Sequence, residues 1–307
     1  MPIQDEPSRR AHPLESERVN VATLDIDRMN PLEIAQIMNA EDARVADAVA
    51  ETLPQIALAI ERIAERMRQG GRMIYAGAGT SGRLGALDAV ECPPTFNVSP
   101  NLIVSSIAGG TFAWTTAAED AEDRADLGES DMTALGLGAR DTVVGIAASG
   151  HTSYVLGAMR HARTCGALTV GIVCNADTPL ERLSDIAITP IVGPEVINGS
   201  TRLKAGTAQK MVLNMLSTGV MILLGKTYRN LMVDVQATNA KLRRRAVGIV
   251  SSATGLDHEE ANRLLEACHG EIKTAIVAHL ASISADEARG RLRASHGIVR
   301  AALDTPS

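Results

Sequence analysis

Short apolar runs alternate with helical segments along the chain after residue 72, and this alternation constrains the fold more than any other feature. Such runs are typical of strands that are buried on both faces, and their alternation with helices is typical of a doubly wound parallel sheet. We therefore predict an α/β fold with a five-stranded parallel sheet. The predicted strands are 73–76, 102–107, 142–147, 168–173 and 186–188.

Helices are predicted on both sides of this strand region. Asn30 is a typical N-cap, and apolar residues at three- and four-residue spacing predict a helical segment over 31–70 with a kink at Pro54. A largely apolar stretch at about 201–224 predicts a long buried helix. From Ser251 onward the sequence predicts helices of about ten residues and no strand, which indicates a small three-helix appendage.

The chain is therefore expected to have three parts. Residues 1–20 contain three prolines and many charges and are predicted to form a flexible N-terminal arm. Residues 21–250 would form the main α/β domain, including its helical N-terminal segment. Residues 251–307 would form the small helical C-terminal domain.

Composition excludes several classes of protein. The net charge of −6 disfavours nucleic acid as a partner. The sequence has no run of 18 apolar residues, which argues against a membrane-spanning protein. The four cysteines have no C-x-x-C spacing and are interpreted as reduced thiols of a cytoplasmic protein. Aromatic residues make up only 2% of the chain, so the core must consist of aliphatic side chains.

Glycines and hydroxyl residues follow the first predicted strand directly. The segment is Gly77-Ala-Gly79-Thr80-Ser81-Gly82-Arg83, and it precedes a predicted helix. The first backbone N–H groups of a helix lack intrahelical partners, and the helix dipole favours negative charge there. Glycine lets the backbone approach a ligand closely, and the two hydroxyls add hydrogen-bond donors. The segment therefore predicts a phosphate-binding loop.

A second loop of the same kind follows the third predicted strand. Ser149, Gly150 and Thr152 precede another helix, and we expect them to hold the same phosphate, since loops at the carboxyl ends of parallel strands lie at one edge of the sheet. His151 lies within this loop and is interpreted as a loop histidine with access to water rather than as a base. Each loop taken alone is also compatible with ordinary helix capping.

The first loop also matches the G-x-G-x-x-G pattern of dinucleotide-binding proteins. That interpretation requires an acidic residue at the end of the next strand. The next apolar run leads into Ser105-Ser106-Ile-Ala-Gly and contains no acid. A dinucleotide-dependent dehydrogenase is therefore the least favoured interpretation, and no cofactor is expected.

Two glutamates are candidates for acid–base chemistry. Glu91 precedes Cys92 and two prolines, so we expect it on a constrained turn that follows the helix. Glu122 belongs to an acidic run, 119–123, that taken alone is most often a solvated helix surface. Two carboxyl groups in one site, one protonated and one ionised, form an acid–base pair. Histidine, cysteine and acidic residues show no metal-ligand spacing, so no metal is expected.

These motifs resemble those of the N-acetylmuramic acid 6-phosphate etherases, which belong to the sugar isomerase (SIS) fold group. The resemblance covers nearly the whole chain after about residue 16. It rests on the loop and helix 77–88, on Glu91-Cys-Pro-Pro-Thr95, on Ile107-Ala-Gly-Gly110, on Ala121-Glu122-Asp123, on Gly145–Gly150, on Asn198–Lys210 and on Leu231–Val235. The chain departs from the family at His151 and Ser153, where Arg and Pro are common.

The resemblance implies a specific reaction. The family cleaves the D-lactyl ether of N-acetylmuramic acid 6-phosphate by elimination and then hydration, which gives N-acetylglucosamine 6-phosphate and D-lactate in cell-wall sugar recycling. It implies that Glu91 and Glu122 are the catalytic acid–base residues. Lys204 and backbone N–H donors are both candidates for stabilising the enolate-like charge. We expect the substrate to contact Gly79, Thr80, Ser81, Gly82, Arg83, Ser149, Gly150, Thr152 and Lys204.

The resemblance also implies a homodimer. If 81–90 is helical, Glu91 lies about 15 Å along the helix axis from the phosphate loop at Ser81. Either the helix breaks early, or Glu91 serves the site of a neighbouring subunit, and we favour a site near the interface.

Two other functions remain open. The glucokinase regulatory proteins share related motifs and bind sugar phosphates without converting them, but they carry two SIS domains, and this chain has room for one. A phosphosugar aldose–ketose isomerase would use the same open-chain chemistry without a leaving group. The presence of both glutamates favours catalysis over a regulator, and incubation with a lactyl-bearing and a lactyl-free phosphosugar would separate the two enzymes.

Overall fold

A five-stranded parallel sheet in the order β2-β1-β3-β4-β5 forms the centre of the molecule. The computed structural model describes residues 14–116, 119–235 and 240–304. The sheet confirms the predicted doubly wound α/β fold, and every strand begins and ends within one residue of its predicted bounds. The strands are β1 (Met73–Gly77), β2 (Ile103–Ile107), β3 (Thr142–Ile146), β4 (Leu168–Ile172) and β5 (Ile186–Ile188).

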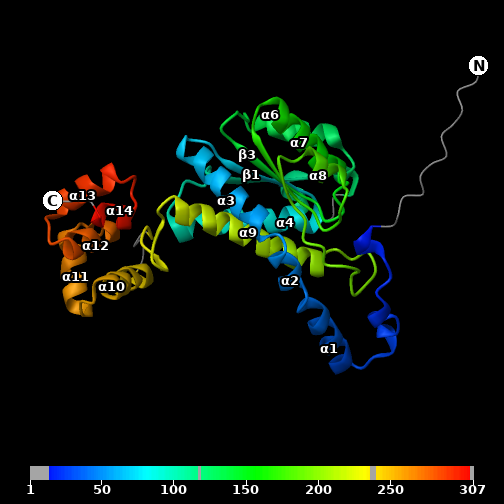
Figure 1. Cartoon of the computed structure of the whole chain (residues 1–307), viewed down its shortest axis with the longest axis horizontal. Helices are drawn as coiled ribbons and strands as arrows, with labels where there is room; N and C mark the ends of the chain where they lie inside the picture. Colours follow the sequence, from blue (N-terminus) through cyan, green and yellow to red (C-terminus); the bar gives the residue numbers. More distant parts are fainter. Residues whose placement is uncertain (1–13, 117–118, 236–239, 305–307) are drawn as a thin grey trace, which may run out of the picture.

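Helices cover both faces of the sheet (Figure 1). One face packs against α3 (Leu53–Arg68), α4 (Gly79–Phe96) and α9 (Lys204–Leu223). The other face packs against α6 (Ala125–Ala134), α7 (Ser153–Thr164) and α8 (Pro179–Leu183). Successive side chains of a strand point to opposite faces, so that in β1 Met73 and Tyr75 enter the first core while Ile74 and Ala76 enter the second.

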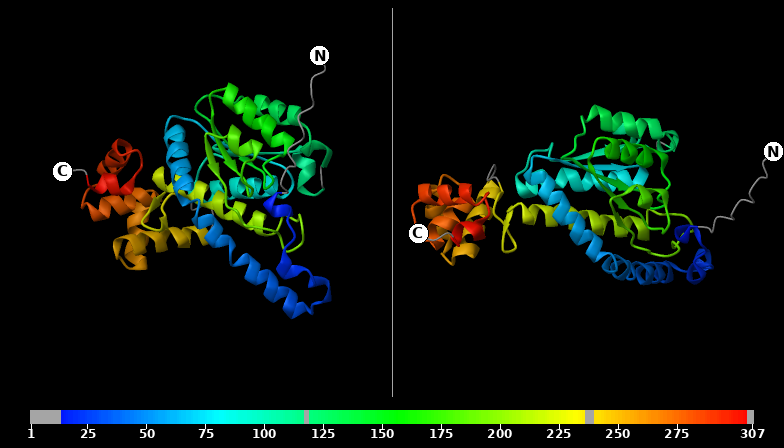
Figure 2. Two further views of the ribbon diagram at one scale, coloured as in Figure 1. Left: turned by 45° about the vertical axis from the view of Figure 1, so that its right-hand side comes forward. Right: turned by 45° about the horizontal axis from the view of Figure 1, so that its top comes forward.

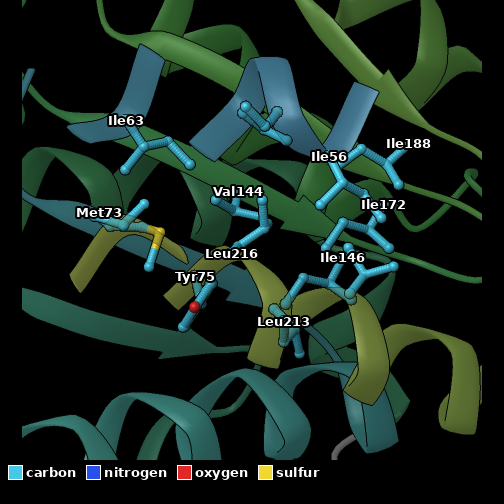
Figure 3. Packing of buried hydrophobic residues seen from close by; sticks show 14 of the residues in the cluster. Ile56, Ile63, Met73, Tyr75, Val144, Ile146, Ile172, Ile188, Leu213 and Leu216 are labelled. Carbon is cyan, nitrogen blue, oxygen red and sulfur yellow. The ribbon is translucent and has the colours of Figure 1, made fainter. Parts of the chain in front are cut away.

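The core between α3, α9 and the sheet is almost entirely aliphatic (Figure 3). In this view Ile56 and Ile63 of α3 lie in the upper part of the core, and Leu213 and Leu216 of α9 lie below them. All four side chains are at most 2% exposed. Branched and unbranched aliphatic side chains thus fill this layer, as the low aromatic content predicted.

The predicted helical segment 31–70 consists of three helices, α1 (Pro31–Asp42), α2 (Val45–Ala50) and α3. We expected one helix with a kink at Pro54, but the chain turns at residues 51–52 and restarts at Leu53. Pro54 cannot donate a hydrogen bond to the carbonyl of Ala50, whereas proline is well tolerated in the first turn of a new helix. A complete break therefore replaces the kink.

Part of the predicted N-terminal arm is docked on the sheet. Residues 1–13 of the arm lie outside the described residues. Ser16, in the 3-10 turn η1 (Glu15–Glu17), is 1% exposed, and its backbone N–H donates to Oδ1 of Asn175 at 3.2 Å, just beyond β4. The chain continues through the 3-10 turns η2 (Val21–Thr23) and η3 (Ile26–Arg28) into α1.

The C-terminal helices form a third core, set apart from the sheet (Figures 1 and 2). This core begins at Tyr228, ahead of the predicted boundary at 251, and includes residues of α10. The boundary stays a prediction, and these contacts favour an earlier one. The elements are β6 (Thr227–Tyr228), β7 (Leu231–Met232), α10 (Ala240–Thr254), α11 (His258–Ala267), α12 (Ile272–Leu280), α13 (Ala285–Ala294) and α14 (Val299–Leu303).

Candidate active site

The two predicted phosphate loops lie side by side. β1 and β3 are neighbours in the sheet, and their last residues, Gly77 and Ile146, are paired in register. The chain runs outward from β1 to β2 on one side and from β3 to β4 on the other, so the loops flank the point where the strand order reverses. In open parallel sheets this is where ligands bind.

The first loop leads directly into α4. Gly79 is the first residue of the helix and has a positive φ of 51°, and a Cβ added there would meet no atom within 4 Å. Gly82 is crowded, because a Cβ there would lie 2.6 Å from Cγ1 of Ile107 and 2.8 Å from the carbonyl oxygen of Gly77. Among the residues that the structure describes, no side chain caps the start of α4. Its first-turn N–H groups are thus arranged to receive an anion beside open space.

The second loop is held in a tight conformation. Gly150 has a positive φ of 71°, and an added Cβ would lie 2.4 Å from Cβ of Thr178. Ser149 Oγ accepts a hydrogen bond from the N–H of His151, which leaves its hydroxyl hydrogen free to donate to a ligand. The ring of His151 is exposed, and Nδ1 donates to the carbonyl of Ser149 at 2.8 Å. This placement fits a loop histidine with access to water.

Glu122 lies at this second loop. It ends the short helix α5 (Glu119–Glu122), and its Oε1 accepts a hydrogen bond from Oγ1 of Thr152 at 3.4 Å. The carboxyl group is half-buried rather than fully solvated. Within one chain, Glu122 and Thr152 are therefore adjacent to the place predicted for the phosphate.

Glu91 lies elsewhere on the molecule. We expected it on a turn, but α4 continues to Phe96 through Pro93 and Pro94, so Glu91 is within the helix and its side chain is exposed. The Thr95 hydroxyl donates to the Glu91 carbonyl at 2.8 Å, next to the carbonyls of Ala89 and Val90, to which Pro93 and Pro94 can donate no N–H. Ser81 and Glu91 are thus about 15 Å apart along one unbroken helix, at 1.5 Å per residue.

Arg83 binds protein rather than facing open space. Its Nε donates to the carbonyl of Ala113 at 2.9 Å, and Nη2 donates to that of Thr116 at 3.3 Å. Both carbonyls belong to the segment around the 3-10 turn η4 (Gly110–Trp114), which leads into the helix that carries Glu122. Arg83 therefore connects α4 with the segment around η4, which precedes Glu122 in the chain. Its predicted contact with substrate stays a prediction.

Lys204 is buried at the start of α9. It is 1% exposed, and Nζ forms an ion pair with Oε2 of Glu41 in α1 at 2.6 Å. Glu195 accepts the backbone N–H groups of Lys204 and Ala205 at 3.0 and 2.9 Å, so a carboxylate already occupies this helix start. The structure thus places the Lys204 ammonium against Glu41. Its role toward substrate stays a prediction.

Sequence reasoning missed a polar cluster beneath α4. Asp88 is 6% exposed and accepts hydrogen bonds from Tyr75 at 2.7 Å, Asn214 at 2.7 Å and Ser217 at 3.0 Å. Burial raises the pKa of Asp88, against these hydrogen bonds, which lower it. The cluster ties α4 to β1 and α9. The available signal was the spacing of Asp88 on the same helix face as the buried Gly85 and Cys92.

The described residues contain no group of three or more His, Cys, Asp or Glu side chains that could hold a metal ion. The expectation that the reaction needs no metal stays a prediction. Throughout the ranges that the structure describes, every helix is too short or too polar to cross a bilayer.

The fold and the paired loops define a class, the SIS-domain proteins. The SIS domain model matches residues 120–219, and that of the glucokinase regulatory protein N-terminal SIS domain matches residues 55–163. The model of the C-terminal lid domain of glucokinase regulatory protein matches residues 229–271. A solved phosphoheptose isomerase from Francisella tularensis has a TM-score of 0.50 at 18% identity, covering 62% of this chain and 98% of its own. That likeness shows the fold alone.

Curated relatives define the family more narrowly. An N-acetylmuramic acid 6-phosphate etherase from Streptomyces avermitilis is 57% identical over 91% of this chain and 90% of its own length. One from Cronobacter sakazakii is 53% identical over 94% of this chain and 98% of its own. The chain belongs to the N-acetylmuramic acid 6-phosphate etherase family.

Proposed function

We propose that this protein cleaves the D-lactyl ether of N-acetylmuramic acid 6-phosphate and releases N-acetylglucosamine 6-phosphate and D-lactate. It would act as a carbon–oxygen lyase in the cytoplasmic recycling of cell-wall sugars. The observation that supports this best is the position of Glu122 at Thr152, beside paired phosphate loops, in a chain 57% identical to a named etherase.

The 6-phosphate would bind between the two loops. The N–H groups at the start of α4 and the hydroxyls of Thr80 and Ser149 supply donors, and the space over Gly79 admits an oxygen of the ligand. This anchor fixes the direction of the sugar, so that its reacting carbons lie toward the acidic residues.

The two glutamates would divide the proton transfers. Opening of the sugar ring exposes the C1 aldehyde, which makes the C2 hydrogen acidic, and Glu122 removes this proton. The bond between C3 and the lactyl oxygen breaks as Glu91 protonates that oxygen, leaving a C2–C3 double bond. Glu91 then takes a proton from water as it adds to C3, and Glu122 returns the proton to C2.

We further propose that the active form is a homodimer with shared sites. C2 and C3 of the sugar are a few bonds from its phosphate, whereas Glu91 is about 15 Å from Ser81 along the unbroken α4. A second copy that presents its own Glu91 removes this conflict. Leu87 and Val90, beside Glu91, are 54% and 63% exposed, as expected for a face that a partner covers.

Release of D-lactate from N-acetylmuramic acid 6-phosphate by the purified protein tests the reaction. We expect release without added metal or nucleotide, and none from Glu91→Ala or Glu122→Ala. In deuterium oxide, Glu91→Ala should still exchange the C2 hydrogen and Glu122→Ala should not. A Glu91→Ala variant that loses C2 exchange while it still releases lactate would contradict the division of roles.

The same assay distinguishes an etherase from the two alternative functions, a regulator and an isomerase. A regulator would bind the sugar phosphate without releasing lactate. An isomerase would convert an aldose phosphate that has a hydroxyl group at C2 and no lactyl group, such as glucose 6-phosphate, into a ketose.

A further inference from the structure

Gln209 is a buried polar side chain at the phosphate loop that the mechanism above does not use. It lies in the second turn of α9, is 1% exposed, and its Oε1 accepts a hydrogen bond from the hydroxyl of Ser81 at 2.9 Å. Ser81 belongs to the first turn of α4, where the phosphate is proposed to bind. The contact therefore joins α9 to the anion site through one hydroxyl.

The other end of this amide is unsatisfied. Within the described residues, Nε2 of Gln209 is buried and has no hydrogen-bond partner. An unpaired buried amide costs about 1–3 kcal/mol, so native structures rarely keep one without a reason. The amide is held only through Oε1, so no bond at Nε2 fixes which way it faces.

The Ser81 hydroxyl has one hydrogen to donate, and this limits what it can do. While Ser81 donates to Gln209, its hydrogen is used within the protein and it offers a ligand only lone pairs. A phosphate dianion has only acceptor oxygens, so the present arrangement cannot make a hydrogen bond from this hydroxyl to phosphate. Turning the amide by 180° lets Nε2 donate to Ser81 Oγ and frees the hydroxyl hydrogen for the phosphate.

We propose that Gln209 is a positioning residue that turns its amide when a phosphorylated ligand binds, so that Ser81 can donate to the phosphate. The inference rests on the proposed phosphosugar function and names a residue that sets affinity for the phosphate group. One hydrogen bond links Gln209 to Ser81 in both orientations of the amide. The turned orientation also allows a hydrogen bond from Ser81 to a charged phosphate oxygen.

Two nearly isosteric variants separate the donor from the acceptor role. Gln209→Glu keeps an acceptor for Ser81 but cannot donate when ionised, and Gln209→Met does neither. We expect both variants to raise KM for N-acetylmuramic acid 6-phosphate about tenfold with a smaller change in kcat, the size of one hydrogen bond to a charged group. The inhibition constant of inorganic phosphate should rise by the same factor.

Ser81→Ala supplies the control for charge repulsion. If Gln209 acts through Ser81, then adding Gln209→Glu or Gln209→Met to Ser81→Ala should weaken phosphate binding no further. The proposal is overturned if Gln209→Glu binds phosphate as the wild type does, or if it weakens binding equally in the Ser81→Ala background. Thermal shifts with inorganic phosphate give the same comparison without turnover, so absence of lactate release by the wild type rejects the proposed function alone.

Discussion

At the scale of single residues, the glycines of the first loop serve different purposes. Gly82 lets α4 approach β1 and β2, since a Cβ there would meet Ile107 and the Gly77 backbone at under 3 Å. Gly79 has open space around it and is required for its positive φ of 51°. Gly82 therefore serves the packing of α4 on the sheet, and Gly79 shapes the proposed phosphate site.

Replacing each glycine by alanine should separate these purposes. Gly82→Ala should lower the free energy of unfolding by about 2–3 kcal/mol through overpacking. Gly79→Ala should cost about 1 kcal/mol through backbone strain, yet weaken phosphate binding more strongly because its methyl group enters the ligand space. Urea unfolding and phosphate inhibition measure the two effects. Equal loss of stability in both variants would contradict the distinction.

At the scale of elements, α4 carries the phosphate loop at its start and is tied to the approach to Glu122 by Arg83. Arg83→Met removes the hydrogen bonds to the carbonyls of Ala113 and Thr116. We expect kcat for lactate release to fall about tenfold, because a small displacement of Glu122 weakens proton removal from C2. Steady-state kinetics measure this loss.

Arg163→Met is the matched control for Arg83. Arg163 also donates to a backbone carbonyl, that of Leu183 at 3.1 Å, but on the opposite layer of the molecule. Its variant should keep the wild-type kcat. Equal effects of the two substitutions would show that Arg83 has no special connection with Glu122.

The ion pair between Glu41 and Lys204 joins α1 to α9. Burial raises the pKa of Glu41, but the hydrogen bonds from Lys204 and Asn20 and the charges of Lys204 and Arg44 together outweigh it, so the pKa lies below its usual range. The pair therefore stabilises the fold fully above the unfolded pKa of Glu41, and this stabilisation is lost as the pH falls through the folded pKa. Glu41→Gln should weaken this acid dependence in urea unfolding measured from pH 7 downward.

Removing the Lys204 ammonium alone should be more costly than replacing both partners. Lys204→Met leaves a buried carboxylate and should cost about 3–5 kcal/mol, whereas Glu41→Leu with Lys204→Met should recover most of that loss. If Lys204→Met instead raised KM at unchanged stability, the ammonium would act on substrate rather than on the fold.

Local sequence patterns predicted the strands and loops well, but they did not predict side-chain contacts between residues far apart in the sequence. The strands were predictable because parallel strands that are buried on both faces are continuous apolar runs, and both loops followed from the rule for carboxyl ends. Lys204 was predicted at the substrate, yet it pairs with a glutamate 163 residues away in the sequence. No local pattern records such a contact, and the same holds for Gln209 and Ser81. Pro93 and Pro94 suggested a helix end where the helix in fact continues.

At the scale of the whole molecule, α4 separates the two glutamates that we propose as the acid–base pair. Glu122 lies at the phosphate loops of its own chain, and Glu91 is about 15 Å from them along α4. In a two-fold dimer each site would then combine the loops and Glu122 of one subunit with Glu91 of the other. The proposed reaction thus requires a homodimer, because Glu91 must come from a second subunit.

A mixture of the two inactive variants tests directly whether each active site is shared between two subunits. Glu91→Ala and Glu122→Ala are unfolded together, refolded as a mixture, and assayed for D-lactate release from N-acetylmuramic acid 6-phosphate. Random pairing makes half of the dimers mixed, and each mixed dimer has one intact site of two, so we predict roughly a quarter of the wild-type activity. Each variant refolded alone should stay inactive. No recovered activity in a mixture whose mixed dimers are verified by differential tagging would contradict the shared site.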